Sequence, residues 1–102
     1  MKDNEFSSYV QDCLSCVGEI VIKPMMGGYL VYYKDKLIGD ICAGELFLKR
    51  TPSSDRFLYG CELRYPYEGS KTLMYVFDDF ENREKIQELL EKMYNELPER
   101  KR

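Results

Sequence analysis

Histidine and tryptophan are both absent from this 102-residue chain, and the lack of histidine has the larger consequence. Histidine is the commonest general base near neutral pH and the commonest metal ligand in proteins. Carboxylates could take its place, but the adjacent Asp78 and Asp79 fit the start of a helix more simply than a catalytic pair. The sequence therefore predicts no catalytic residues, no metal or other cofactor, and no enzyme activity.

Long apolar runs and positive charge are also in short supply. No stretch approaches the ~20 apolar residues that a membrane-spanning helix needs, and the N-terminal residues MKDNEFSSYVQD are too acidic for a secretory signal. The net charge is −3, whereas proteins that bind nucleic acids through phosphates cluster Lys and Arg on one face. We expect a cytoplasmic protein that does not enter a membrane and does not bind nucleic acid directly.

What the chain does contain is enough apolar and aromatic mass for one modest core. Hydrophobic residues make up 44% of the sequence and charged residues 32%, with Tyr and Phe well represented. Such a composition is typical of a globular domain, and the length fits one. Because there is no internal repeat, low-complexity tract or linker, residues 1–102 are predicted to form a single domain.

Apolar residues at three- and four-residue spacing predict a helix near each end of the chain. The first covers about residues 4–17, and the last carries the following apolar stripe: Ile86, Leu89, Leu90, Met93 and Leu97. Asp79 or Asn82 can cap the start of the last helix, and Pro98 follows its final apolar residue. A third helix of one or two turns is predicted after Thr51, with Gly60 as its end.

Between these helices the sequence is rich in β-branched and aromatic residues, as strands are. The predicted strands lie at residues 20–22, 29–33, 37–42, 46–49, 61–67 and 72–77. Short polar or glycine-containing breaks separate the neighbouring strands, which is typical of hairpins. We therefore expect a two-layer α+β fold, in which an antiparallel sheet has the N- and C-terminal helices on one face.

The strand that begins at Tyr29 carries apolar side chains on both of its faces. Alternation puts Tyr29, Val31 and Tyr33 on one side, and Leu30 and Tyr32 on the other. A sheet that is apolar on both sides in so small a chain is often covered by a second subunit or a bound protein. We predict that Tyr29, Val31 and Tyr33 form an interaction face for a protein partner, and that the protein is a homodimer.

The paired glycine in KPMMGGYLVYY raises the question of a phosphate-binding loop. Gly27 and Gly28 lack the G-x-G-x-x-G pattern and precede a strand, so no helix N-terminus follows them to receive a phosphate. Glycine reaches backbone conformations that other residues adopt poorly, and we predict a turn or bulge between Met26 and Tyr29. Met25 and Met26 are interpreted as core or adaptable contact residues.

Several pieces of sequence together resemble the signature of the TfoX N-terminal domain family. The pieces are MMGGY at residues 25–29, the following Tyr32 and Asp35, and ELFLK at residues 45–49, in matching order and spacing. The motif residues that carry the resemblance are Met25, Met26, Gly27, Gly28 and Tyr32. The chain departs from the family at Lys23-Pro24, where Arg more often directly precedes Met, and at Leu30, where Gly is common.

With its flanking helices and strands, the resemblance extends over a core of about residues 5–97. It implies a two-layer α+β fold similar to that of type III secretion chaperones. It also implies a part in transcriptional regulation, like the N-terminal domain of a bacterial regulator of competence (DNA-uptake) genes. That regulator has a second, C-terminal domain, which these 102 residues are expected to lack. We therefore expect a non-enzymatic regulatory or protein-interaction domain.

The four cysteines leave one alternative open, a thiol-based redox sensor or a zinc-binding protein that uses Cys13, Cys16, Cys42 and Cys61. The Cys13-x-x-Cys16 pair falls at the C-terminal end of its predicted helix, where the helix dipole disfavours a thiolate. Cys42 and Cys61 lack the paired spacing of zinc ribbons. Because Cys13 also lies on the apolar stripe, we expect buried, reduced structural thiols.

Overall fold

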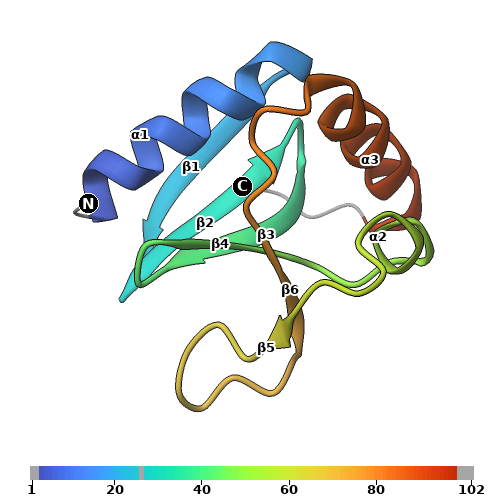
Figure 1. The fold of residues 1–102 in the computed structure, drawn as a ribbon. Helices are drawn as coiled ribbons and strands as arrows, with labels where there is room; N and C mark the ends of the chain where they lie inside the picture. Colours follow the sequence, from blue (N-terminus) through green and yellow to red (C-terminus); the bar gives the residue numbers. More distant parts are fainter. Residues whose placement is uncertain (1–2, 26, 99–102) are drawn as a thin grey trace.

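The strands of the protein form one antiparallel sheet in the order β1-β2-β3-β4-β6-β5, seen in a computed structural model that describes residues 3–25 and 27–98 (Figure 1). The strands are β1 (Ile20–Met25), β2 (Gly28–Tyr33), β3 (Lys36–Cys42), β4 (Glu45–Leu48), β5 (Leu63–Arg64) and β6 (Met74–Phe77). The helices are α1 (Asp3–Leu14), the 3-10 helix η1 (Ser15–Val17), α2 (Pro52–Phe57) and α3 (Arg83–Glu96). Strands β1 to β4 form a meander, and α2 and β5 come before β6 in the chain.

Helices α1 and α3 pack on the same face of the sheet, which we call the inner face (Figure 1). Tyr33 of β2 joins the two helical ends: its hydroxyl donates to the carbonyl of Val17 at 3.3 Å, and its ring meets that of Tyr94 edge-on at 5.8 Å. One apolar cluster includes residues of both helices and of five strands. The predicted two-layer α+β fold, with the N- and C-terminal helices on one face, is confirmed.

The helices form because their apolar residues recur at the helical spacing and face this core. In α1 the buried side chains Phe6, Val10 and Leu14 lie four residues apart, one above the other on a single face. Each such side chain contributes about 1.5–3 kcal/mol when it is fully buried. At the start of α3, the side chain of Asn82 accepts a hydrogen bond from the backbone N–H of Lys85 at 3.2 Å, so Asn82 is the N-cap.

The two glycines after β1 have different structural roles. Gly27 lies in the turn between β1 and β2 with φ at +83°, a conformation that favours glycine. Gly28 begins β2, where a Cβ atom would collide with the backbone carbonyl of Ile41 in β3. The turn explains Gly27, and the close approach of two strands explains Gly28. Met26 lies outside the described residues.

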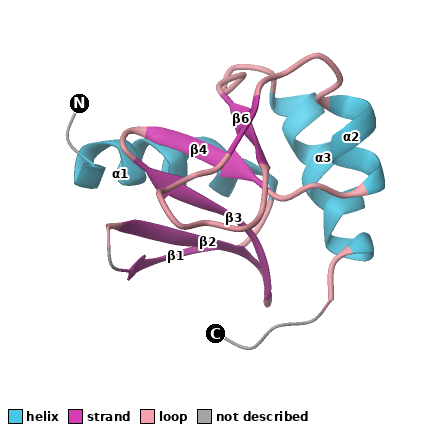
Figure 2. Cartoon of the chain, turned by 90° about the horizontal axis from the view of Figure 1, so that it is seen from below, coloured by secondary structure: helices cyan, strands magenta, loops and turns pink. Residues whose placement is uncertain are grey.

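The strand predicted at residues 61–67 is much shorter than expected. Only Leu63–Arg64 pairs with β6, and residues 65–73 form a loop on the side of the sheet away from the helices (Figure 2). Pro66 lacks the backbone N–H that a strand would need to continue the ladder, and its side chain is buried. We call residues 65–73 the β5–β6 loop.

The prediction that Tyr29, Val31 and Tyr33 form an exposed interaction face is wrong. Val31 and Tyr33 are buried in the core, and Tyr29 is half-buried against it. Their side chains alternate onto the inner face, where the apolar stripes of α1 and α3 cover them. The face that remains open on β2 is the other one, which carries Leu30 and Tyr32.

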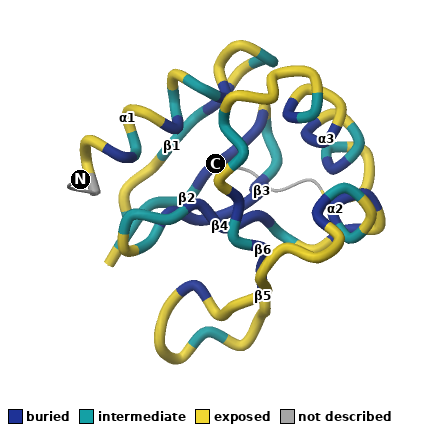
Figure 3. The backbone as a smooth tube through the Cα atoms, viewed as in Figure 1, coloured by how far each residue is buried: buried dark blue, intermediate teal, exposed yellow. Residues whose placement is uncertain are grey.

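Most residues of the loops, and of the helix faces that point away from the sheet, are exposed to solvent. Figure 3 shows the middle strands as buried and the β5–β6 loop as mostly exposed. Across residues 3–25 and 27–98, no helix combines the length and the apolar character needed to cross a membrane.

Candidate functional site

The outer face of the sheet carries a second, smaller set of buried apolar side chains. Its members do not belong to the helix-packed core cluster: they are Tyr32, Leu37, Phe47 and Met74. Phe47 of β4 lies opposite Val76 of β6, and the guanidinium of Arg64 lies 5.7 Å from the centre of its ring. No helix among residues 3–25 and 27–98 packs on this face, and the β5–β6 loop supplies part of its cover.

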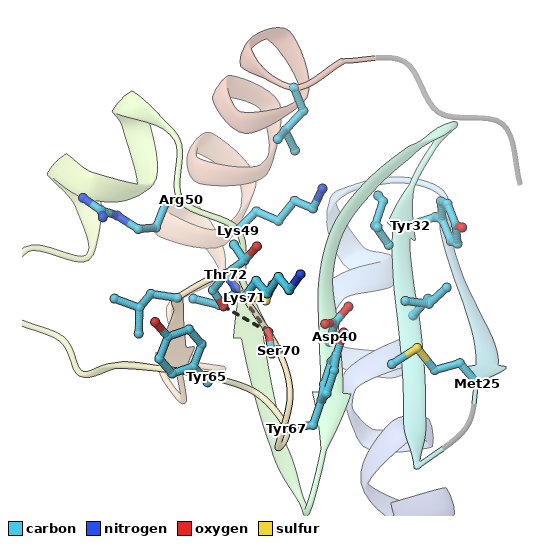
Figure 4. Close-up of a pocket in the computed structure, with 15 residues that line it drawn as sticks. Met25, Tyr32, Asp40, Lys49, Arg50, Tyr65, Tyr67, Ser70, Lys71 and Thr72 are labelled. Carbon is cyan, nitrogen blue, oxygen red and sulfur yellow. Dashed lines mark hydrogen bonds between the residues drawn. The ribbon is translucent and has the colours of Figure 1, made fainter.

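Between the β5–β6 loop and the outer face lies a hollow of about 730 Å³, which we call the outer hollow (Figure 4). Leu30, Tyr32 and Leu37 line it from the sheet, and Tyr65 and Tyr67 line it from the loop. This volume lies within the range of about 300–1,000 Å³ that is typical of small-molecule sites, and the apolar and aromatic lining is also typical.

Asp40 brings a carboxylate into the outer hollow from the middle of β3. Its exposed fraction is only 8%, and burial raises the pKa of Asp40 above its ordinary value, although the positive charge of nearby Lys49 opposes this shift. Figure 4 shows the Lys49 side chain extending into the space in front of β3. Asp40 and Lys49 therefore partly balance each other's charge within the hollow.

Two further cations line the outer hollow, and they differ in their partners. Arg50 donates from Nε to Oδ1 of Asp55 at 3.0 Å, and Figure 4 shows its side chain directed away from the hollow, toward α2. Lys71 comes from the β5–β6 loop and makes no hydrogen bond or ion pair with the other described residues. Lys71 is therefore the cation of the hollow that no other described group neutralises.

Arg64 of β5 is hydrogen-bonded to Glu45, the first residue of β4. Both terminal nitrogens of Arg64 donate to the two carboxylate oxygens of Glu45 at 2.7 Å, and its Nε donates to Glu62 at 2.8 Å. The hydrogen bonds from Arg64 lower the pKa of Glu45. A bidentate pair fixes geometry as well as charge, so the start of the β5–β6 loop is held at a defined place beside the sheet.

Exposed apolar side chains are concentrated around β5. Among the described residues, the large apolar side chains that are strongly exposed are Tyr9, Tyr59, Leu63, Tyr65, Tyr67 and Leu73. All of them except Tyr9 lie within residues 59–73, which we call the aromatic segment. The most exposed is Tyr59, at 90%.

The free edge of the sheet at β1 is poorly suited to pairing with another strand. The carbonyl of Glu19 accepts a hydrogen bond from the β2 side, so alternate residues beginning with Ile20 direct their backbone groups outward. The outward carbonyl of Ile20 already accepts a hydrogen bond from the Gln11 side chain of α1 at 2.8 Å. The alternate residues that follow Ile20 on this edge are Ile22 and Pro24, and Pro24 has no N–H to donate. Contact through the sheet face is therefore favoured over contact through this edge.

The cysteines are less buried than expected. Cys16 and Cys61 are exposed, and Cys13 and Cys42 are half-buried. The thiol of Cys16 donates to the carbonyl of Cys13 at 3.0 Å. Within residues 3–25 and 27–98, which include all four thiols, no three His, Cys, Asp or Glu side chains are grouped so that they could hold a metal ion.

Of the motif residues, Met25 and Tyr32 come together at the outer hollow, whereas Gly27 and Gly28 shape the backbone beside it. Sequence reasoning did not identify Asp40, Lys71 or the tyrosines of the loop as a site. The available signals were a charged residue in the middle of an apolar strand and the run Tyr65-Pro66-Tyr67 in a segment otherwise typical of a turn.

Comparison with known proteins gives one relative and no family. The chain is 27% identical over 96 residues to a Spirochaeta aurantia protein described as an uncharacterized 12.7 kDa protein in the trpE 5′ region, an alignment that covers 94% of this chain and 84% of that protein. No family model matches the chain. No solved structure matches it either. The resemblance to the TfoX N-terminal domain family stays a prediction.

Proposed function

We propose that the chain is a non-enzymatic regulatory domain that acts in the cytoplasm by binding protein, and that the aromatic segment is its contact surface. The observation that carries the proposal is the concentration of exposed apolar side chains within residues 59–73. Tyrosine is enriched at protein interfaces, because its ring is apolar and its hydroxyl can still form hydrogen bonds. The resemblance to a competence-gene regulator supports a regulatory role, and the net charge of −3 favours protein over nucleic acid as the partner.

The partner that we propose is a second copy of the chain. In a symmetric dimer the same patch lies on both sides of the interface, so one apolar segment is enough to form it. Light scattering during gel filtration at micromolar concentration should give about twice the mass of the 12.1 kDa chain. Replacing two exposed tyrosines, Tyr59→Ser with Tyr65→Ser, should shift the protein to the monomer without loss of folding.

Tyr9→Ser on α1 is the matched control, because it removes an exposed tyrosine outside the aromatic segment. We expect the Tyr9→Ser variant to remain a dimer, with the same mass by light scattering as the wild-type protein. A wild-type protein that is monomeric at all concentrations, or a dimer that the two substitutions leave intact, would contradict the proposal.

Accessible thiols favour a second candidate function, the sensing of oxidants at Cys13 and Cys16. Both cysteines line one shallow surface hollow, so a small oxidant in solution can reach them. Peroxide would oxidise the two thiols to a disulfide and would itself be reduced to water. Mass spectrometry after mild peroxide treatment tests this candidate, with Cys16→Ser as the control. An unchanged mass would eliminate it.

A further inference from the structure

We propose that the outer hollow binds a small organic anion, with an aromatic or apolar body and a single carboxylate, sulfonate or phosphate group. This inference goes beyond the proposed protein contact, with which it shares Tyr65 and Tyr67 of the aromatic segment. It rests on three features of the hollow: its apolar lining, its unpaired hydrogen-bond donors and its local excess of positive charge (Figure 4).

The apolar lining suits a flat hydrophobic body. Leu30, Leu37 and the ring of Tyr32 form the floor on the outer face of the sheet, and Tyr67 and Met74 lie on the side of the loop and β6. Tyr32 and Leu37 face each other across the β2–β3 pair, so their side chains make a continuous surface. A bound ring would remove this surface from water, and the hydrophobic effect favours that removal.

Apart from the carboxylate of Asp40, which is an acceptor, several side chains of the hollow have hydrogen-bond donors without a partner among the described residues. The ammonium of Lys71 and the hydroxyls of Tyr65 and Tyr67 form no hydrogen bond with the other described residues, although each of these side chains lines the hollow. An ammonium can only donate, and a tyrosine hydroxyl donates readily to an anionic oxygen. A ligand with an anionic group could accept hydrogen bonds from all of these donors.

The charge balance in the hollow points to the same ligand class. Among the described residues that line the hollow, the one carboxylate, Asp40, interacts electrostatically with Lys49, and Arg50 forms an ion pair with Asp55. These pairings leave the charge of Lys71 uncompensated, in a chain whose net charge is −3. Lys71 is itself exposed, so its attraction for an anion acts together with the burial of the apolar body of the ligand against the sheet.

The frame of the hollow favours a small molecule over a long peptide. The β5–β6 loop is held at one end by the bidentate pair of Arg64 with Glu45, and at the other end by the pairing of β6 with β4. The loop is therefore fixed at both ends, and the hollow beneath it has a volume of about 730 Å³. That space fits a molecule of one or two rings.

The test uses 8-anilinonaphthalene-1-sulfonate, an aromatic anion whose fluorescence rises when it is bound, and its uncharged parent N-phenyl-1-naphthylamine. Titration of the native protein should give saturable binding of the anion with one site per chain. Lys71→Glu should weaken this binding by about tenfold or more, since it removes a charge-assisted hydrogen bond. It should change the binding of the uncharged parent much less.

Lys92→Glu is the matched control, because it makes the same charge change on the exposed side of α3, where Lys92 lies 3.6 Å from Glu88. We expect it to leave binding of the anion unchanged. Lys71 is exposed on a loop, so both variants should keep the wild-type circular dichroism. The proposal is overturned if the anion does not bind the native protein, if Lys71→Glu and Lys92→Glu have the same effect, or if the uncharged parent loses affinity equally in Lys71→Glu.

Discussion

Asp40 is a carboxylate that is buried on a strand, β3. Burial raises its pKa, so the folded state favours the protonated form more than the unfolded state does. The contribution of Asp40 to stability should therefore be most favourable below the ordinary Asp pKa of about 3.9. This contribution should be lost as the pH rises through the raised pKa of Asp40 in the folded protein. Asparagine has nearly the same shape and stays neutral at every pH.

Asp40→Asn should accordingly stabilise the protein at pH 7, and the gain should disappear in acid. Urea unfolding, followed by circular dichroism at pH 7 and in acid, measures the difference in the free energy of unfolding between the variant and the wild type. Asp78→Asn, at an exposed position next to β6, is the control for the change in net charge. A variant that is less stable than the wild type at pH 7 would show that the attraction between Asp40 and Lys49 outweighs the cost of burial.

Gly39 of β3 lies where the backbone of the neighbouring strand β4 approaches closely, and a substitution there tests this close approach. A Cβ atom at this position would collide with the backbone carbonyl of Phe47, and backbone cannot move aside as a flexible side chain can. Gly39→Ala should therefore lower the free energy of unfolding by at least about 2 kcal/mol. Gly44→Ala, in an open turn with φ at +74°, should cost only about 1–2 kcal/mol through backbone strain. Equal costs in urea unfolding would argue against the collision.

Helix α2 is an element that depends on its first residues. The Thr51 hydroxyl accepts from the backbone of Ser54 at 3.0 Å, and the Ser54 hydroxyl accepts from the backbone of Thr51 at 2.7 Å. Ser53 ties the same end to α3, since its hydroxyl donates to Glu96 at 2.6 Å. A helix of six residues has too few internal hydrogen bonds to be stable without such contacts.

Thr51→Ala should lower the free energy of unfolding by about 1 kcal/mol, because it removes an N-cap. Thr51→Ser keeps the hydroxyl and should cost less. Thermal unfolding of the two variants gives the comparison, and a serine variant as unstable as the alanine variant would mean that packing of the Thr51 methyl group is what matters.

Elements with a strong local pattern could be predicted from the sequence. The spacing of Phe6, Val10 and Leu14 predicts α1, because it repeats within a few helical turns. Asp79 or Asn82 is predicted to cap α3, and the structure has Asn82 in that position. The strand predicted at residues 61–67 includes Pro66, which cannot donate to a ladder, and β5 is accordingly shorter, at Leu63–Arg64. The orientation of β2 could not be deduced, because Val31 and Tyr32 are both apolar and only the packing of distant helices decides between them.

At the scale of the whole molecule, the two faces of the sheet differ in what covers them. Two helices close the inner face around one core, whereas a loop held by Arg64 covers part of the outer face. The outer hollow escaped prediction because Asp40 and Lys71 are separated by 30 residues of sequence and no local pattern links them. A site built from a strand and a distant loop becomes visible only when the sheet is assembled.

Pro24 and Gln11, which restrict hydrogen bonding along β1, have a consequence for the behaviour of the protein at high concentration. An open strand edge is a template on which further chains can add, and this is how fibrils begin. Pro24→Val would restore an outward N–H in a strand already rich in isoleucine and valine. We expect faster fibril growth at high concentration, measured by thioflavin T fluorescence, with Pro52→Ala in α2 as the control. A single residue without an N–H thus helps to keep each sheet separate from its neighbours in a crowded solution.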